Sequence, residues 1–323
     1  MQNQRSKGQM ERPKAGSDLA FLPRKGDELH SSGQEHLPEF SIVVPCYNEV
    51  TAIQQTLQEI RNSIPEDAVY TIILVDDGST DGTSALLESF SSSNIKVISH
   101  SRNRGYGAAL KSGIRAAETE LIAITDADGT YPNDRLPELI ALCRDHDMVV
   151  GARTSKDVTY SRLRAFPKLF LRIWISWIAR QNVPDINSGM RVFRRSIALD
   201  YFGILPDGFS FTITITLAML TSFKSVVFLP ISYKSRVGAS KIKPIRDTIS
   251  FIKLVIRTGM YFAPLRSIMP LFVIIFSAAT ASAAYDVFVL ANLTDKTIIL
   301  FLFSMNTMMF GLLADMIDKR VGR

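Results

Sequence analysis

The amino-acid sequence predicts an α/β domain, with a mainly parallel sheet and flanking helices, followed by a two-helix transmembrane hairpin. Between residues 40 and 144, short apolar runs rich in Val and Ile alternate with segments whose apolar residues recur at helical spacing. Strands that alternate with helices require right-handed crossovers and therefore a mainly parallel sheet. Near the C-terminus, two almost uncharged segments are each long enough to cross the apolar core of a bilayer.

The composition agrees with a soluble domain joined to a more apolar part. The chain has 323 residues, of which 46% are hydrophobic and 21% charged, and its mean hydropathy is +0.12. Its two cysteines, Cys46 and Cys143, are too few for a disulfide framework, which favours a reducing compartment. The net charge of +6 is compatible with nucleic acid, anionic lipid or phosphorylated substrates, and does not choose among them.

The elements are expected in the following order. Residues 1–37 are polar, without a periodic apolar face or the apolar stretch of a secretory signal, and should form a disordered tail. The folded domain is placed at residues 38–243. Its first strands are expected over residues 40–45, 70–75, 95–99 and 121–124, and its first helices over about 53–64, 83–90, 108–117 and 134–144.

Asp126 and Asp128 directly follow the buried strand predicted over residues 121–124. Residues two apart on an extended chain point the same way, so both carboxylates can converge at the carboxyl end of that strand, where ligands bind in open α/β sheets. Carboxylate oxygens suit a hard divalent cation such as Mg²⁺ or Mn²⁺, whose coordination is often completed by substrate phosphates. A simple polar turn is the alternative explanation of a lone Asp-x-Asp.

Two more strand ends carry polar clusters, namely Pro45-Cys46-Tyr47-Asn48-Glu49 and Val75-Asp76-Asp77-Gly78-Ser79-Thr80-Asp81. With Asp126-Ala127-Asp128, this ordered set resembles the family 2 glycosyltransferases of the GT-A fold, over roughly residues 40–241. The resemblance implies a UDP- or GDP-linked nucleotide sugar and a divalent metal held by Asp126 and Asp128. The residues implied in nucleotide-sugar binding are Pro45, Tyr47, Glu49, Asp76, Asp77 and Asp126.

The residue types agree with those roles. A carboxylate accepts hydrogen bonds from nucleobase N–H or ribose O–H groups, and a metal neutralises the diphosphate as it leaves. A turn and helix N-cap is the alternative for the second cluster, and we expect it for Ser79, Thr80 and Asp81.

Three later motifs narrow the resemblance, Gly151-Ala152-Arg153, Asp185-Ile186-Asn187-Ser188-Gly189-Met190-Arg191 and Arg236-Val237-Gly238-Ala239-Ser240-Lys241. They are similar to the polyprenyl-phosphate sugar transferases, the group that includes dolichyl-phosphate mannose synthase. The likeness implies catalytic roles for Asp128, Arg153 and Arg191, and closure of Ser240 and Lys241 over the donor diphosphate. The residues implied in binding the acceptor phosphate are Arg153, Arg164, Lys168, Ser188 and Arg191.

Arginine suits these roles because its planar fork matches phosphate bidentately, while a lysine acts as a mobile point charge. Taken singly, each arginine is equally well explained as a solvated surface residue.

One segment departs from the family pattern. Many relatives carry an acidic residue after the aromatic pair that matches Gly208-Phe209-Ser210-Phe211, whereas here Thr212-Ile213-Thr214-Ile215-Thr216 follows. A sugar hydroxyl would need a general base nearby, but a lipid phosphate is already an anion. The missing acid favours a phosphate acceptor and leaves open whether a dedicated base exists.

Residues 160–177 alternate basic residues with aromatic and aliphatic ones. Such a segment can lie in the headgroup plane, with Trp174 and Trp177 at the interface and Arg164, Lys168 and Arg172 near lipid phosphate. An ordinary amphipathic helix on the domain core is the alternative.

The C-terminal part is expected to bind the membrane. Residues 244–266 form a predicted interfacial amphipathic helix, 267–316 the transmembrane hairpin with spans near 268–290 and 297–314, and 317–323 a basic tail. Positive residues flank both ends of the hairpin, which predicts two transmembrane helices with the catalytic domain in the cytoplasm. A soluble two-helix element is the alternative.

The sequence therefore predicts a membrane-anchored inverting glycosyltransferase that moves a sugar from a nucleotide-sugar donor to a polyprenyl phosphate (undecaprenyl or dolichyl) at the cytoplasmic face. One alternative is transfer to a sugar or glycan acceptor in polysaccharide synthesis. Another is a membrane scaffold that binds nucleotide sugar without turnover. No nucleic-acid partner is expected. The sugar, the nucleotide base, the lipid length and whether copies associate as a homo-oligomer stay open.

Overall fold

The structure is a computed structural model, and it describes residues 36–154, 173–233 and 256–321. The implied roles of Arg164 and Lys168, and of Ser240 and Lys241, therefore lie outside the described residues. So do nearly all of the predicted N-terminal tail and the first half of the predicted interfacial helix.

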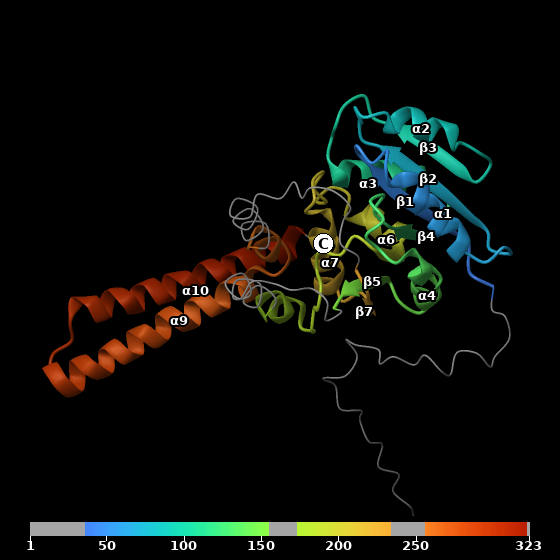
Figure 1. Cartoon of the computed structure of the whole chain (residues 1–323). Coiled ribbons are helices and arrows are strands. Elements are labelled where there is room, and N and C mark those ends of the chain that lie inside the picture. The colour runs from blue at the N-terminus through green and yellow to red at the C-terminus, as the bar shows by residue number, and fades with distance from the viewer. Residues whose placement is uncertain (1–35, 155–172, 234–255, 322–323) are drawn as a thin grey trace, which may run out of the picture.

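A seven-stranded sheet, in the order β3-β2-β1-β4-β6-β5-β7, is the centre of the domain (Figure 1). All adjacent pairs are parallel except those that β6 makes with β4 and β5. The predicted α/β class with a mainly parallel sheet is thus confirmed. The strands are β1 (Phe40–Cys46), β2 (Tyr70–Asp76), β3 (Ile95–Ser99), β4 (Leu121–Ile124), β5 (Met148–Arg153), β6 (Arg191–Arg194) and β7 (Val226–Ile231).

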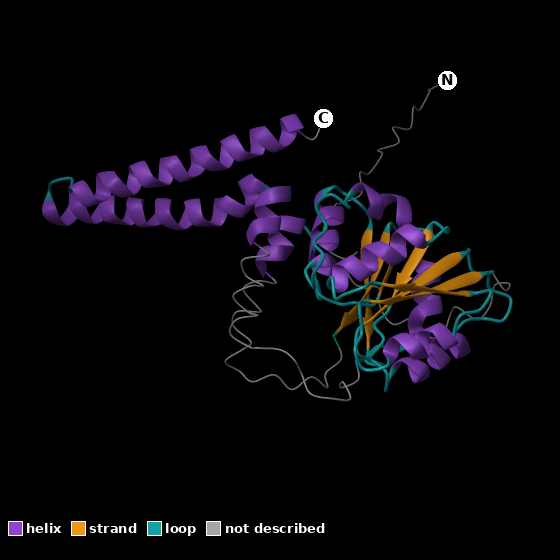
Figure 2. Cartoon of the chain, turned by 90° about the horizontal axis from the view of Figure 1, so that it is seen from above, coloured by secondary structure: helices purple, strands orange, loops and turns teal. Residues whose placement is uncertain are grey.

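Helices cover both faces of this sheet, as the view from above shows (Figure 2). Alternate residues of β1 point to opposite faces, so Val43 joins one apolar core and Ile42 and Val44 join the other. The helices of the domain are α1 (Ile53–Ser63), α2 (Thr83–Ser89), α3 (Tyr106–Ala116), η1 (Asn133–Arg135), α4 (Leu136–Leu142), α6 (Arg195–Asp200) and α7 (Phe211–Thr221).

The first eight elements occur in the expected order, and their ends shift by a few residues. The helix expected from residue 108 begins at Tyr106, directly after Gly105, which has a φ of 104°. The helix expected near residue 134 begins with the 3₁₀ turn η1 before α4, which has Pro137 in its first turn. Proline is tolerated there because the first turn leaves its N–H groups unpaired.

Two long apolar helices, α9 (Pro264–Tyr285) and α10 (Asp295–Val321), project from the domain as a hairpin (Figures 1 and 2). A π-helical segment, η2 (Asp286–Leu290), extends α9. By length and composition, Pro264–Leu290 and Asp295–Ile317 can each cross a membrane, and their large apolar side chains are mostly exposed. This agrees with the predicted two-span hairpin, although both helices begin a few residues earlier than expected.

The tip of the hairpin is closed by the buried carboxylate of Asp286. Its Oδ2 accepts hydrogen bonds from the Thr294 N–H, 2.8 Å away, and from the Thr297 hydroxyl, 2.7 Å away. Because these donors stand at the start of α10, the carboxylate joins the end of one helix to the beginning of the next.

The base of the hairpin is fixed to the domain. The Arg266 guanidinium donates to the backbone oxygen of Ile178 at 2.9 Å, and the Trp177 indole N–H donates to the backbone oxygen of Arg266 at 3.3 Å. Trp177 is 54% exposed, whereas Trp174 packs against the domain core. In the described part of the basic and aromatic segment, one tryptophan therefore faces the core and the other stays available to a membrane interface.

Candidate active site

The loops that follow β1 and β2 are tied to each other at the carboxyl edge of the sheet. The Thr80 N–H donates to Asn48 Oδ1 at 2.8 Å, and the Asn48 N–H donates to Ser79 Oγ at 3.0 Å. Asn48 has a φ of 55°, a left-handed conformation that asparagine tolerates better than most residues. Glu49 follows, and its N–H donates to Thr83 Oγ1 at 3.0 Å. The implied nucleotide residues of both loops are therefore neighbours in space.

Asp76 is buried and satisfied within its own turn. Its Oδ1 accepts hydrogen bonds from the Ser79 N–H at 3.0 Å and the Ser79 hydroxyl at 2.6 Å, and its Oδ2 accepts one from the Ser84 hydroxyl. Asp81 accepts from the Thr83 N–H within the same turn, which agrees with the turn alternative, whereas the N-cap of α2 is Gly82 and not Asp81. The nucleotide-sugar contact implied for Asp76 stays a prediction.

Asp77 holds the loop that leads into α3. Its Oδ1 accepts hydrogen bonds from His100 Nδ1 at 2.7 Å and the Arg104 N–H at 2.9 Å, and its Oδ2 accepts from the Gly105 N–H at 2.8 Å. The other ring nitrogen of His100 lies 2.9 Å from Ser112 Oγ. Sequence reasoning missed His100, because no spacing rule links the end of β3 to the end of β2.

The two carboxylates of the Asp-x-Asp turn lie at the end of β4, beside the tied loops. Asp126 Oδ1 accepts a hydrogen bond from the Tyr106 hydroxyl at 2.9 Å, and Asp128 Oδ1 accepts from the Thr130 hydroxyl at 2.6 Å. Burial, reinforced by the negative charge of Asp128, raises the pKa of Asp126 to about 6. Two carboxylates that repel each other at a half-buried edge suit a divalent cation, which removes the repulsion.

Among the described residues, no group of three or more His, Cys, Asp or Glu side chains could hold a metal by itself. This fits a cation of the Mg²⁺ or Mn²⁺ type, which binds through one or two carboxylates and takes its other ligands from substrate phosphates and water. The donor set is thus suited to a metal that arrives with a diphosphate.

Tyr106 links this turn to the segment that carries the aromatic pair Phe209 and Phe211. Burial and the charge of Asp126 raise its pKa well above the usual range, so its hydroxyl stays a donor. Phe209, which is 80% exposed, stacks on the Tyr106 ring with centroids 5.5 Å apart. The loop that carries Phe209 is docked on α3, because the Ala108 N–H donates to the Asp207 oxygen at 2.9 Å.

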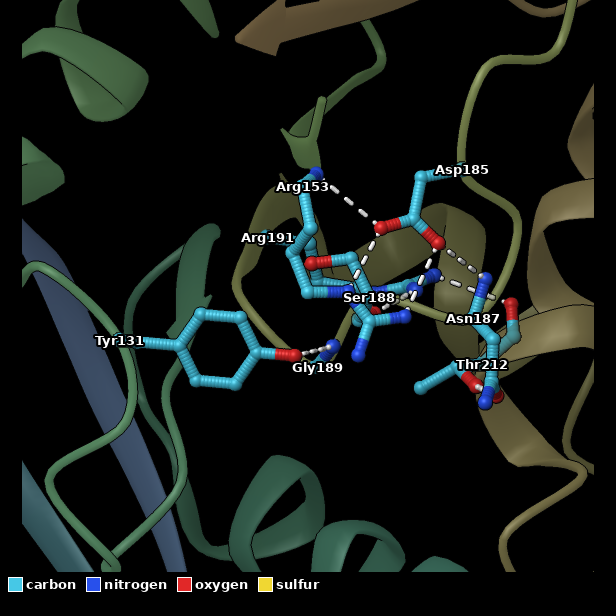
Figure 3. A network of polar contacts seen from close by, with 8 residues as sticks. All are labelled: Tyr131, Arg153, Asp185, Asn187, Ser188, Gly189, Arg191 and Thr212. Atoms are coloured by element: carbon cyan, nitrogen blue, oxygen red, sulfur yellow. Dashed lines mark hydrogen bonds and ion pairs between the residues drawn. The ribbon is translucent and has the colours of Figure 1, made fainter. Parts of the chain in front are cut away.

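Arg153, at the end of β5, forms a two-point ion pair with Asp185 (Figure 3). The two nitrogen–oxygen distances are 2.7 Å and 3.0 Å. Although burial acts in the opposite sense, the hydrogen bonds of Arg153 hold the pKa of Asp185 below its usual value. The structure thus brings two of the later motifs together, and the guanidinium that was predicted to face phosphate is already neutralised by an aspartate.

Arg191 is completely buried and its guanidinium contacts the protein (Figure 3). It donates to the backbone oxygen of Thr212 and to Thr216 Oγ1, both at 3.0 Å, and to the backbone oxygen of Ser188. Burial lowers its pKa to about 10, so it stays protonated near neutral pH. The phosphate contacts implied for Arg191 and for the buried Ser188 stay predictions.

The loop before Arg191 reaches the Asp-x-Asp turn. Arg191 pairs with Ile124 in the antiparallel register of β6 and β4, which places Gly189 over Asp126. A Cβ atom on Gly189 would lie 2.9 Å from both carboxylate oxygens of Asp126. The Gly189 N–H donates to the Tyr131 hydroxyl at 2.6 Å. Glycine is required here because the backbone and the carboxylate approach so closely.

Solved structures share this fold. The structure of glucosyl-3-phosphoglycerate synthase from Mycobacterium tuberculosis, in complex with Mn²⁺, UDP-glucose and phosphoglyceric acid, superposes with a TM-score of 0.55. It covers 68% of this chain and 79% of its own, at 16% sequence identity. The similarity confirms the expected GT-A type of α/β fold.

Two curated relatives are similar in sequence. The undecaprenyl-phosphate mannosyltransferase of Micrococcus luteus is 27% identical over 219 residues, which cover 62% of this chain and 86% of the relative. The dolichyl-phosphate hexose transferase of Haloferax volcanii is 28% identical over 221 residues, which cover 68% of this chain and 93% of the relative.

Two family models match different parts of the chain. The model described as glycosyl transferase family 2 matches residues 41–202, which include both tied loops, the Asp-x-Asp turn and Arg191. The model described as GtrB C-terminal hairpin matches residues 263–319, which are the two apolar helices. The chain therefore belongs to glycosyl transferase family 2, as a glycosyltransferase that ends in a hairpin of the GtrB type.

Proposed function

We propose that the protein transfers a sugar from a nucleotide-sugar donor to a polyprenyl phosphate, with inversion, at the cytoplasmic face of a membrane. One observation carries this proposal: the Asp126 and Asp128 carboxylates stand beside the tied β1 and β2 loops, in a domain that is fixed to an apolar hairpin. The names of the Micrococcus and Haloferax relatives, which both denote transfer to a polyprenyl phosphate, support the choice of acceptor.

In the proposed reaction, a phosphate oxygen of the acceptor attacks the anomeric carbon, and the bond from that carbon to the donor diphosphate breaks. A divalent metal bound by Asp126 and Asp128 would stabilise the charge on the departing diphosphate. Tyr106 holds Asp126 in place through its hydroxyl, and Gly189 lets the neighbouring loop close over the same carboxylate. The chain supplies orientation and electrostatic stabilisation, which is the main part of such catalysis.

The acceptor needs no base from this chain. Residues 212–216 contain no carboxylate, and Thr212 instead donates to the side-chain oxygen of Asn187 at 3.1 Å. An acceptor phosphate carries its negative charge before it reacts, so its oxygen is already a nucleophile at neutral pH.

The orientation proposed for the hairpin follows from its charges. Arg257 and Arg266 precede α9 or lie in its first turn, and Lys319 and Arg320 lie in the last turn of α10. Both helix ends stand at the base of the hairpin, on the side of the domain (Figure 1). An excess of positive residues marks the cytoplasmic side of membrane helices, so the domain is proposed to be cytoplasmic.

The test uses the full-length protein in detergent, with Mg²⁺ or Mn²⁺, undecaprenyl or dolichyl phosphate and a panel of labelled nucleotide sugars. We expect the label of at least one donor to enter the organic phase as a lipid-linked sugar. If no donor gives this product, the proposal is wrong. Label on a water-soluble glycan would support the alternative acceptor, and donor binding without any turnover would support the scaffold.

A further inference from the structure

Asp77 has little hydrogen-bonding capacity left for a ligand. Its side chain is only 4% exposed. A carboxylate offers about four acceptor positions, divided between its two oxygens. Within the described part of the chain, Oδ1 accepts from both His100 and the Arg104 N–H, whereas Oδ2 accepts from the Gly105 N–H alone. One acceptor position therefore remains, and it belongs to Oδ2.

The donors that fill Oδ1 are held firmly. The His100 ring is buried between Asp77 and Ser112, and the His100 N–H donates to the backbone oxygen of Asp76 at 2.8 Å. The backbone before α3 is confined as well, because a Cβ on Gly105 would lie 2.5 Å from the Asp207 oxygen. Both donors of Oδ1 are thus held by the fold, and the remaining acceptor capacity of Asp77 lies on Oδ2.

Asp77 also lies beside the loop that follows β1, which carries other residues implied in nucleotide-sugar binding. Its N–H donates to the backbone oxygen of Cys46 at 2.8 Å, which places it next to Tyr47. Tyr47 is 38% exposed and belongs to the loop that follows β1. A base can stack on an exposed aromatic side chain while its edge donates to a neighbouring carboxylate.

Nucleobases differ in the donors that their ring edges offer. Uracil offers a single imide N–H between two carbonyl groups. Guanine offers two neighbouring N–H donors, which a carboxylate can satisfy only with both oxygens. Cytosine has a lone pair where uracil has its N–H, and this lone pair repels a carboxylate oxygen. A site with one remaining acceptor position therefore matches uracil and leaves a donor of guanine unpaired, which is costly when buried.

We propose that the hydrogen bond from His100 fills the acceptor capacity of Asp77 Oδ1 and thereby makes the donor site selective for a uracil nucleotide. This inference rests on the proposed function, because it requires a nucleotide-sugar donor. Asp77 contacts the base through Oδ2. His100 acts through Asp77 and is a positioning residue.

The first test compares nucleotides on the unmodified protein. Titration calorimetry on the full chain in detergent with Mn²⁺ measures the dissociation constants of UDP, CDP, GDP and ADP. We expect UDP to bind at least roughly tenfold more tightly than CDP and GDP. If GDP or CDP binds as tightly as UDP, the inference is overturned and the proposed function stands. If no nucleoside diphosphate binds, the proposed function fails as well.

The second test separates Asp77 from the rest of the site. Asp77→Asn should narrow the ratio of UDP to CDP affinity, since its amide N–H can donate to the lone pair of cytosine. His100→Ala should narrow the ratio of UDP to GDP affinity, since Oδ1 could then accept a hydrogen bond from the second N–H donor of guanine. Asp134→Asn, at an exposed acid on η1, is the control and should leave both ratios unchanged. Thermal unfolding identifies the variants that fold. Unchanged ratios in folded Asp77 and His100 variants would overturn the inference.

Discussion

The carboxylates of Asp126 and Asp128 stand two residues apart but have different surroundings. Asp126 accepts a hydrogen bond from outside its own turn, from the Tyr106 hydroxyl, and Gly189 lies close against its carboxylate. Asp128 is bound by the Thr130 N–H and hydroxyl of its own turn. Burial and the charge of Asp128 raise the pKa of Asp126 to about 6. A divalent cation bound at this edge would favour the charged form of both carboxylates.

Asp128→Ala is expected to lower turnover by at least about a hundredfold, because the departing diphosphate loses its charge stabilisation. The fold should persist, since Asp126 keeps its hydrogen bond from Tyr106 and the hydrogen bonds that Thr130 donates to Asp128 lie within a single turn. Transfer assays and thermal unfolding measure the two effects. Chelation of divalent metal should give the same loss in the unmodified protein. Asp134→Ala is the matched control, and wild-type activity of Asp128→Ala would refute the metal role.

Arg191→Met is expected to destabilise the protein by about 2–4 kcal/mol, because the backbone oxygens of Thr212 and Ser188 and the Thr216 hydroxyl would each lose a hydrogen bond from the buried guanidinium. This should lower the midpoint of thermal unfolding in detergent by several degrees. Arg61→Met, at an exposed arginine of α1, is the control and should shift it little. An unchanged midpoint for Arg191→Met would show that the guanidinium does not hold α7 and the Ser188 loop.

Spacing predicted Asp126 and Asp128 just beyond the carboxyl end of a strand, and β4 does end at Ile124. Their convergence on one point stays a prediction, because both residues lie beyond the strand, where strand alternation no longer fixes their directions. The inward direction of Arg191 could not be predicted from spacing. Its partners Thr212 and Thr216 lie on α7, more than twenty residues later in the chain, and their contact depends on how α7 packs. The same holds for Asp77 and His100, which come together only because β2 and β3 are neighbours.

At the scale of elements, α3 connects the sheet to the active site. Its first residue, Tyr106, reaches Asp126, and its Gly113 packs against Val43 of β1. The helical spacing of apolar residues predicted α3. It could not predict how closely Gly113 packs against Val43, because that depends on how the helix lies on the sheet. β6 was not predicted either, since its four residues begin and end with arginine and resemble a motif more than a strand.

Gly113→Ala should destabilise the protein although alanine is the better helix former by about 1 kcal/mol. A Cβ at this position would lie 2.4 Å from Val43 Cγ1, and overpacking of this kind typically costs about 1–3 kcal/mol. Thermal unfolding should show a lower midpoint. Gly203→Ala is the control, because a Cβ there meets no atom within 4 Å. Gly113→Ala should lower the midpoint less in a Val43→Ala background than in the unmodified protein, because the shorter side chain leaves room for the Cβ. An equal effect in both backgrounds would exclude the clash as the cause.

At the scale of the whole molecule, two hydrogen bonds among the described residues join the domain to the hairpin: the Arg266 guanidinium donates to the backbone oxygen of Ile178, and the Trp177 indole N–H donates to the backbone oxygen of Arg266. The order of the two parts was evident from hydropathy along the sequence. The attachment of the hairpin to the domain was not evident from the sequence, because it depends on backbone oxygens that any residue can offer.

The proposed orientation predicts opposite labelling at the two ends of the hairpin. A thiol introduced by Asn292→Cys, in the loop at the tip, should react with an impermeant maleimide added to intact cells. One introduced by Arg320→Cys, at the base, should react only after the cells are opened. Cys46 and Cys143 are buried, and burial raises the pKa of both thiols, so the unmodified protein serves as the unreactive control. Labelling of Arg320→Cys in intact cells would reverse the orientation.

The attachment at Arg266 has a kinetic consequence. A domain held at a constant height above the bilayer meets its water-soluble donor in three dimensions and its lipid acceptor in two. Turnover should therefore follow the mole fraction of acceptor in the membrane, and dilution with inert lipid should slow it at a constant total amount of acceptor per volume.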